Sequence, residues 1–167
     1  MTRRGQAAWL LVALGLAGCG IVGGGSAKLE AIWTGSDKGR LTASASALWC
    51  RDARIAEITA MHGDTGVSVL IHPAESLVVG RYPIVEPGSA RASAPAAALA
   101  LRLLGSTTVV GYRSESGTLT LERVAEGRLW GRFETQAEVV TSPAGTVKLN
   151  GRFAGVPVAA GGTACPP

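Results

Sequence analysis

Two stretches near the C-terminal end of the chain alternate between apolar and polar residues, and this alternation constrains the fold more than any other feature. In residues 128–139, alternate positions read Leu-Gly-Phe-Thr-Ala-Val, whereas most positions between them carry charged or amide side chains. Residues 146–156 repeat the pattern with valine, leucine, glycine and phenylalanine on one side. Because successive side chains of a strand point to opposite faces of a sheet, each stretch predicts a long strand with one face on a core.

Shorter segments upstream show the same signal. Alternating or β-branched residues bounded by Gly, Pro and Ser predict further strands at 41–50, 55–61, 67–71 and 80–85. Residues 86–95, which are rich in Pro, Gly, Ser and Ala, are expected to form an exposed loop.

The segments between these regions are read from their local composition. Residues 109–113 and 118–124 are expected to pair as a hairpin around a Ser-Glu-Ser-Gly turn at 114–117. Residues 96–104 fit either a strand, because leucine alternates with alanine and arginine, or a helix capped by Ser93. The alternation favours the strand.

This arrangement of elements predicts an all-β fold. Several short strands are separated by turn signals, and no convincing long amphipathic helix is present. Such a pattern is typical of an antiparallel β-sandwich or barrel, and local patterning does not choose between the two. The single β-rich domain is expected to occupy residues 29–167.

A short echo links the two long strands. Leu-Trp-Gly-Arg-Phe at 129–133 returns as Leu-Asn-Gly-Arg-Phe at 149–153. A core-facing glycine removes bulk, so that a large neighbouring side chain can settle over it. We therefore expect the rings of Phe133 and Phe153 to fill the core beside the glycines.

The arginines of the echo, Arg132 and Arg152, are expected to face outward on neighbouring strands. They form either a paired anion clamp or ordinary exposed cations near Glu134 and Glu138. The second interpretation is favoured, because charged residues on a polar strand face are usually solvated.

The first nineteen residues have the parts of an export signal. Arg3 and Arg4 form a positive end, and residues 7–17 form an uncharged apolar core of 11 residues. This core is shorter than the ~20 apolar residues that a membrane-spanning helix needs. It leads into Leu16-Ala17-Gly18-Cys19, and the whole segment resembles the signal peptide of bacterial lipoproteins.

The resemblance implies that residues 1–18 are removed by cleavage between Gly18 and Cys19, and that Cys19 carries fatty acyl chains, palmitate among them. More than one chain anchors a protein stably in a bilayer. Gly20, not aspartate, follows the cysteine, which implies the outer membrane if the host is Gram-negative. Residues 19–28 are then a glycine-rich tether of about 15–18 Å r.m.s. span.

One competing motif overlaps this segment. Residues 18–23 match the glycine spacing of a dinucleotide-binding loop, and Asp37 follows at a suitable distance. That loop requires a strand before it and a helix after it. A further run of glycine follows here, so nucleotide binding is not expected.

The chain has three cysteines, and if Cys19 carries the lipid, two remain. In an oxidising envelope such a pair most often forms a disulfide, which predicts a Cys50–Cys165 bridge. Closing a loop of this size is worth about 4–5 kcal/mol in the chain-entropy model. Two free thiols, or ligation of a metal by the two cysteines, are the alternatives.

The charge of the chain gives no support to nucleic-acid binding. The full sequence has 16 basic and 12 acidic residues, and removal of Arg3 and Arg4 leaves 14 basic residues and a net charge of +2. The remaining basic residues are scattered and are not interleaved with aromatic residues.

The two histidines are the obvious candidate metal ligands. His62 and His72 have Asp64 and Glu75 nearby in the sequence, and these residue types ligate zinc or copper. The strand between the histidines spans roughly 16 Å, however, which is too far for one ion. No metal site and no cofactor are therefore predicted.

Motifs for covalent catalysis are missing from the sequence. It contains no Gly-x-Ser-x-Gly elbow, no Ser-x-x-Lys and no His-Glu-x-x-His. Ser44, Ser46 and Ser114 are possible hydroxyl donors, but no pattern selects one of them. Glu134 and Glu138 share a strand face, and a pair of carboxylates can hydrolyse a glycoside, but simple exposure on the polar face is the favoured explanation. No catalytic residue is predicted.

Trp130 is the one candidate ligand contact. It lies on the polar face of its strand, where it forms either a stacking platform for a sugar or partner side chain, or a cover for an apolar edge.

These features predict an envelope-anchored lipoprotein with a non-enzymatic β-sheet module that binds a partner or has a structural role. Its expected partners are the bilayer, through acylated Cys19, and an envelope protein or glycan. The alternatives are an envelope hydrolase or metal-dependent enzyme with dispersed site residues, and a small-ligand carrier if the strands enclose a hollow barrel.

Overall fold

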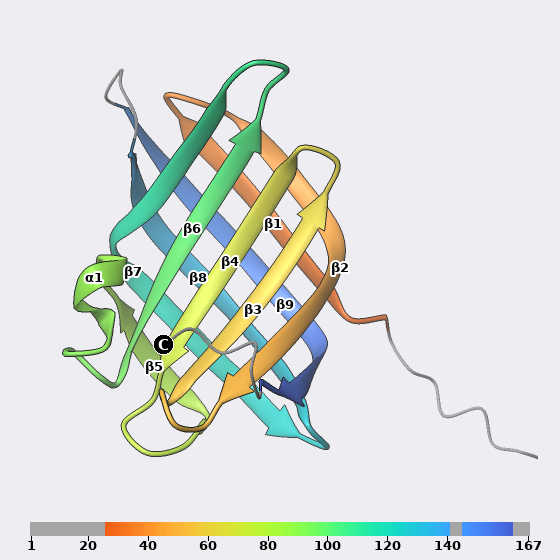
Figure 1. The fold of residues 1–167 in the computed structure, drawn as a ribbon, viewed down its shortest axis with the longest axis vertical. Coiled ribbons are helices and arrows are strands. Elements are labelled where there is room, and N and C mark those ends of the chain that lie inside the picture. The colour runs from red at the N-terminus through yellow and green to blue at the C-terminus, as the bar shows by residue number, and fades with distance from the viewer. Residues whose placement is uncertain (1–25, 141–144, 162–167) are drawn as a thin grey trace, which may run out of the picture.

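The strands form one sheet that closes into a barrel (Figure 1). The computed structural model describes residues 26–140 and 145–161. In this part of the chain the strands are β1 (Lys28–Gly35), β2 (Gly39–Cys50), β3 (Ile55–His62), β4 (Thr65–His72), β5 (Gly80–Ile84), β6 (Ala96–Leu104), β7 (Val109–Ala125), β8 (Arg128–Val139) and β9 (Thr146–Ala160), and helix α1 (Pro87–Ala90) lies between β5 and β6.

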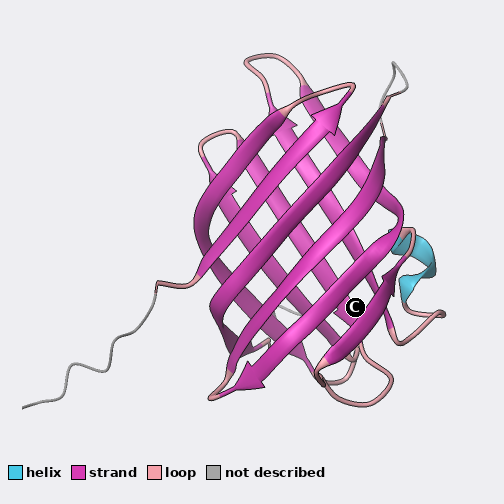
Figure 2. Cartoon of the chain, turned by 180° about the vertical axis from the view of Figure 1, so that it is seen from behind, coloured by secondary structure: helices cyan, strands magenta, loops and turns pink. Residues whose placement is uncertain are grey.

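The order of strands around the barrel is β1-β2-β3-β4-β6-β5-β7-β8-β9, and β9 closes the sheet by pairing with β1. Figure 2 shows the barrel from behind, with the strands running obliquely around it. Neighbouring strands are antiparallel, except for short parallel contacts between β5 and β6 and between β2 and β9. The predicted all-β antiparallel fold is confirmed. Of the two architectures that the sequence left open, the structure is the barrel.

The barrel interior is an apolar core. Every second residue is buried from Leu41 to Ala47 in β2 and from Leu129 to Ala137 in β8, as the alternation predicted. The largest fully buried side chains come from β1, β3, β4, β6, β7, β8 and β9, and they are Phe153, Leu29, Ile58, Ile71, Leu99, Leu101, Leu119, Leu121, Leu129, Leu149, Val67 and Val69. Each such side chain stabilises the fold by about 1.5–3 kcal/mol.

Two reciprocal pairs of phenylalanine and glycine hold β8 against β9. In their ladder Phe133 lies opposite Gly151, and Phe153 lies opposite Gly131. A Cβ atom at Gly131 would stand 2.6 Å from Cζ of Phe153, and one at Gly151 would collide with the ring of Phe133. The expectation that the two rings fill the space beside the glycines is therefore confirmed.

The hairpin expected at 109–124 is wrong, because β7 is one strand of 17 residues. It pairs with β6 as far as Arg113 and with β5 from Gly117 onward, whereas β8 runs along its other side. The change of neighbour coincides with a bulge between Ser114 and Ser116 and with a positive φ of 146° at Gly117. The Ser-Glu-Ser-Gly sequence thus marks a bulge and not a turn.

Ser114 lies at the point along β7 where its pairing partner changes from β6 to β5. Its buried hydroxyl accepts a hydrogen bond from the amide of Leu99 (3.0 Å) and donates one to the carbonyl of Val85 (2.7 Å). These two backbone groups would otherwise be unpaired at the split in the ladder. The role of this serine is therefore structural.

The segment before β6 departs from the expected loop. Residues 86–95 are mostly exposed, but they include α1, which begins with Pro87 and buries Ala90. Proline suits the first turn of a helix, because its fixed φ matches the helical value. The strand favoured at 96–104 is confirmed as β6. No helix of the described residues is long and apolar enough to span a membrane.

Candidate functional site

A row of polar side chains crosses five neighbouring strands on the outer surface of the barrel. The register places Arg81, Thr120, Arg132, Arg152 and Glu30 next to one another on β5, β7, β8, β9 and β1. Because neighbouring strands are about 4.8 Å apart, this row is about 19 Å long. No single segment of the sequence contains more than one of its members.

A second row lies two residues further along the same strands. Thr118, Glu134, Asn150 and Ile32 occupy β7, β8, β9 and β1. Both rows line a groove of ≈ 800 Å³, which we call the outer groove. Its floor is the sheet itself at Ala31, Phe133 and Gly151, and the side chains of Ala31 and Phe133 are buried on the inner side.

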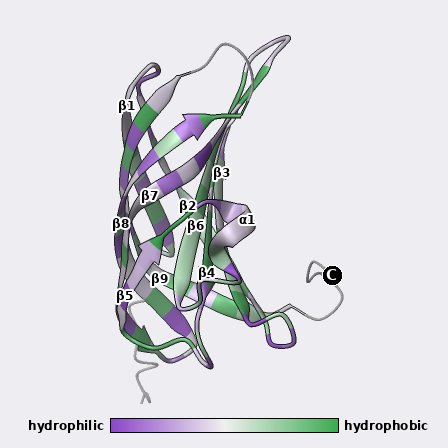
Figure 3. Cartoon of the chain, turned by 90° about the vertical axis from the view of Figure 1, so that its left-hand side faces the viewer, coloured by the Kyte–Doolittle hydropathy of each residue, from purple (hydrophilic) through white to green (hydrophobic). Residues whose placement is uncertain are grey.

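The outer groove continues into a neighbouring hollow. This second hollow, of ≈ 310 Å³, shares Arg81, Thr118 and Glu134 with the groove and reaches Gln136 and Lys148. The two together form an elongated polar depression, which we call the trough. Figure 3 shows the wall that bears it from the side, with β1, β8, β7 and β5 along one edge of the view.

Arg132 and Arg152 are direct neighbours across β8 and β9, so the prediction that both face outward on adjacent strands is confirmed. Their carboxylate partners are not the expected ones, however. Arg132 pairs with Glu122 of β7, and Arg152 pairs with Glu30 of β1 at 2.7 Å. The partners lie on opposite sides of the two arginines, and this arrangement reduces the repulsion between neighbouring like charges.

These pairs are solvent-exposed, since the side chains of Arg132 and Arg152 are 64% and 72% exposed. Exposed ion pairs contribute only about 0–1 kcal/mol each, so a ligand can replace them at little cost. Arg81 and Glu134 have no ion-pair partner among residues 26–140 and 145–161. The outer groove therefore presents an unpaired cation, an unpaired carboxylate and two arginines that exchange partners easily.

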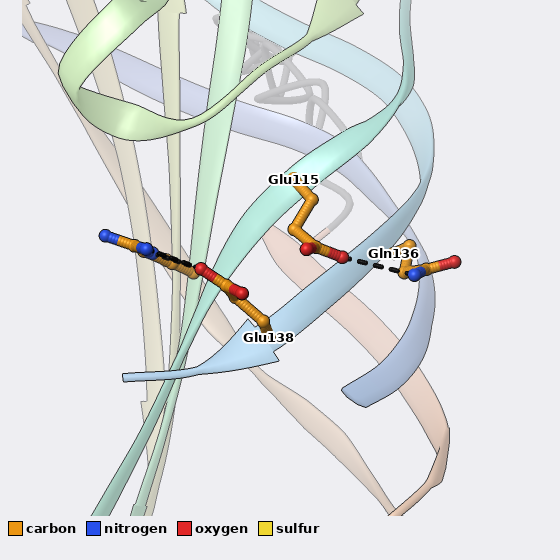
Figure 4. A network of polar contacts seen from close by, with 4 residues as sticks. Glu115, Gln136 and Glu138 are labelled. Carbon is orange, nitrogen blue, oxygen red and sulfur yellow. Dashed lines mark hydrogen bonds and ion pairs between the residues drawn. The ribbon is translucent and has the colours of Figure 1, made fainter. Parts of the chain in front are cut away.

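A polar network on β7 and β8 extends from Gln136, at the edge of the trough (Figure 4). Gln136 donates a hydrogen bond to Glu115 (3.1 Å), and Arg113 donates one to Glu138 (2.8 Å). The hydrogen bond with Glu138, together with its charge, raises the pKa of the Arg113 guanidinium. The network ties the two strands together on either side of the bulge, and it accounts for Glu138 without a catalytic role.

Trp130 does not line the trough. It is half-buried beside the turn between β7 and β8, and the guanidinium of Arg123 lies 4.3 Å from the centre of its ring. This is the geometry of a cation–π contact. A ligand that stacked on this face of the ring would first have to displace Arg123, and the role predicted for Trp130 stays a prediction.

The two histidines lie at opposite ends of β4. His62 pairs with Thr65 at one end, and His72 pairs with Ala96 at the other. The described residues contain no cluster of three or more His, Cys, Asp or Glu side chains that could hold a metal ion. Ser44 and Ser46 are exposed on the outer face of β2.

The predicted lipidation site and cleavage site, Cys19 and Gly18, lie outside the described residues, as does Cys165. Cys50 is buried at the end of β2. The amide of Gly161 donates a hydrogen bond to the carbonyl of Trp49 (3.0 Å), so the end of β9 lies next to Cys50.

No family model matches this chain, and neither curated protein sequences nor solved structures give a significant match. The site therefore has to be judged on its own residues. Sequence reasoning found Arg132, Arg152 and Glu134, but it missed Arg81, Thr118 and Asn150. Only the register between β5, β7, β8 and β9 brings these six residues together.

Proposed function

We propose that this chain is an envelope-anchored lipoprotein whose barrel is a non-enzymatic binding module, with the trough as its contact face for an extended polar partner. The observation that carries this proposal is the continuity of the outer groove with the hollow beside it. Together they cross five strands and offer far more length than one small molecule needs.

The chemistry of the trough supports an envelope glycan or an extended protein segment as the partner. Guanidinium groups bind carboxylates, and the threonines and Asn150 both donate and accept hydrogen bonds. Glu134 adds an acceptor for amide or hydroxyl donors. A chain that carries carboxylates, amides and hydroxyls at intervals would satisfy this mixed lining.

Two features support binding over catalysis or carriage. Hydrolysis by carboxylates uses a pair of acids. Glu30 is ion-paired with Arg152, so Glu134 is the one carboxylate of the outer groove that has no ion-pair partner among the described residues. Large apolar side chains from most of the strands occupy the barrel interior, which is where a carrier would place its ligand. A partner would therefore use the outside of the barrel.

The lipid anchor is supported by the sequence at 1–19. β1 starts at the end of the barrel that also holds the turn between β2 and β3 and the end of β4 (Figure 1). A short tether from Cys19 would therefore bring this end to the bilayer, in the outer membrane if the host is Gram-negative.

Cys19→Ala should move the protein from the detergent phase to the aqueous phase of a cell-envelope extract. Retention of the variant in the detergent phase would contradict the anchor.

The Cys50–Cys165 disulfide belongs to the same proposal. Cys165 follows Gly161 by four residues, which reach at most about 14 Å when extended. Because Gly161 is hydrogen-bonded beside Cys50, that reach covers the ~5.5 Å that separates the Cα atoms of a disulfide. The bridge would close the end of β9 onto the end of β2.

Site-specific crosslinking in intact cells tests the contact face. A photoreactive residue at Asn150, inside the trough, should capture a discrete envelope component. The matched control is Thr59, which is exposed on β3 on the opposite side of the barrel. Capture of the same component from both positions, or of none from Asn150, would contradict the proposal.

A further inference from the structure

A second, smaller pocket lies at the end of the barrel where β1 begins. It has a volume of ≈ 260 Å³, and three segments of the described chain line it: the turn between β2 and β3, the end of β4 with the residues that follow it, and the chain after α1. Its members are Ala53, Arg54, His72, Pro73, Ala74, Arg91 and Ala94. None of these residues belongs to the trough.

His72 is the buried polar group of this pocket. Only 6% of the residue is exposed, and its Nδ1 atom has no hydrogen-bond partner among the described residues. A buried polar atom without a partner is unusual in a folded protein, and a hydrogen bond from a small ligand or a water molecule would satisfy it. Burial, and secondly the charge of Arg91, lower the pKa of His72, which favours the neutral imidazole.

Two arginines supply the charge of the pocket. Arg54 donates a hydrogen bond from Nη1 to the carbonyl of Ala74 (2.9 Å), which holds its guanidinium across two of the lining segments. A guanidinium has five N–H donors, so this bond leaves others for a ligand. Arg91 is the second cation, and no carboxylate of the described residues belongs to the lining. Asp52 and Glu75, in the same segments, lie outside it.

We infer that this pocket binds a phosphate-type oxyanion, with the guanidinium groups of Arg54 and Arg91 holding its charge and His72 donating a hydrogen bond to it. The volume suits this class, because a water molecule takes up about 30 Å³ and the pocket therefore holds one phosphate group with a few waters. Planar guanidinium groups are the side chains best matched to phosphate oxygens.

The phosphate group could come from free phosphate or from the headgroup of a membrane lipid. The second source depends on the proposed anchor, which would place this end of the barrel at the bilayer. The first source does not depend on it. The two sources can therefore be tested separately.

The experiment follows the imidazole resonances of the full chain in non-ionic detergent by NMR during a pH titration. Inorganic phosphate should raise the pKa of His72, because a bound anion favours the protonated imidazole, and it should leave His62 unchanged. Sodium chloride at the same ionic strength should not raise the pKa of His72.

Arg91→Gln should weaken phosphate binding by about tenfold. Arg51→Gln, in the same turn as Arg54 but outside the lining, should bind phosphate as the wild type does.

A second titration replaces inorganic phosphate with phosphatidylglycerol vesicles. A response of His72 to the vesicles identifies the lipid headgroup as a ligand, and a response to inorganic phosphate alone identifies the free anion. Either response supports the site, provided that Arg91→Gln reduces it. If His72 responds to neither, or responds equally in Arg91→Gln, the inference is overturned and a buried water accounts for Nδ1. Failure of the vesicle arm alone would exclude the lipid headgroup as the source of the phosphate and would leave the oxyanion site standing.

Discussion

Two parts of the barrel wall face the same interior but differ in the small residues that they point into it. In the part formed by β8, β9 and β1, which we call the glycine wall, inward glycines alternate with large rings such as Phe133 and Phe153. In the part formed by β2, β3, β4 and β6, which we call the alanine wall, many inward residues are alanines, among them Ala43, Ala45, Ala47, Ala60 and Ala97. In both walls, small inward side chains leave volume that larger side chains can occupy, as a close-packed core requires.

The outer faces of the two walls differ as well. The glycine wall carries Arg132, Arg152, Glu30 and Glu134 of the outer groove, whereas the outer face of β2 carries Thr42, Ser44 and Ser46. Both walls obey the same alternation, so the difference lies in which residues occupy the outward positions. Four predictions test this comparison.

The largest effect is expected where the two walls are joined. If Cys50 of the alanine wall is bonded to Cys165 beyond β9, then Cys165→Ser should lower the free energy of unfolding by about 4 kcal/mol in the chain-entropy model. Urea denaturation with and without a reductant measures it. The reductant should cause the same loss in the wild type and none in the variant. If the urea midpoint of the wild type is the same with and without the reductant, the bridge is refuted.

A smaller loss is expected from overfilling the glycine wall. Gly151→Ala places a methyl group against the ring of Phe133 and the carbonyl of Glu30, and backbone cannot yield easily. We expect thermal or urea unfolding to show a loss of about 2–3 kcal/mol. The matched control is Gly88→Ala in α1, where a Cβ atom meets nothing within 4 Å. That variant should stay within about 1 kcal/mol of the wild type. Equal losses of stability at both glycines would show that packing of the Phe133 ring does not require a glycine at position 151.

The next effect is expected where β7 leaves the alanine wall. Ser114→Ala would leave the amide of Leu99 and the carbonyl of Val85 without their partner, at a cost of about 1–3 kcal/mol. Ser116→Ala, an exposed serine at the same bulge, should change stability by no more than about 0.5 kcal/mol. The denaturant midpoints of the two variants, compared with that of the wild type, measure these losses of stability. If they coincide, the hydroxyl is not needed at the split in the ladder.

The smallest effect on stability is expected at the outer groove. Arg152→Gln removes one exposed ion pair and should cost less than about 1 kcal/mol, yet it should abolish crosslinking of the partner from position 150. Arg113→Gln removes a comparable exposed pair, with Glu138, outside the trough. It should leave the crosslinking unchanged. Equal loss of capture in both variants would mean that the trough is not the contact face.

The local pattern predicted most of the strands and the sides on which their residues lie. It was wrong at 109–124, because a Ser-Glu-Ser-Gly sequence has the same composition in a bulge as in a turn. It was incomplete at the outer groove, because Arg81 and Asn150 look like isolated polar residues until the strands are paired. It also named Glu134 and Glu138 as neighbours of the arginines, whereas Glu122 and Glu30 are the partners.

The sequence by itself determined that the chain folds into strands, which residues of each strand enter the core, and that two glycines would lie beside two phenylalanines. These properties follow from the two-residue period of a strand and from side-chain size, and both are local. Only the tertiary structure decided that the sheet closes into a barrel, that β7 exchanges β6 for β5, and that arginines from three strands share one groove. Those properties depend on which strands become neighbours and in what register, and contacts between distant segments are not encoded in any single stretch of the chain.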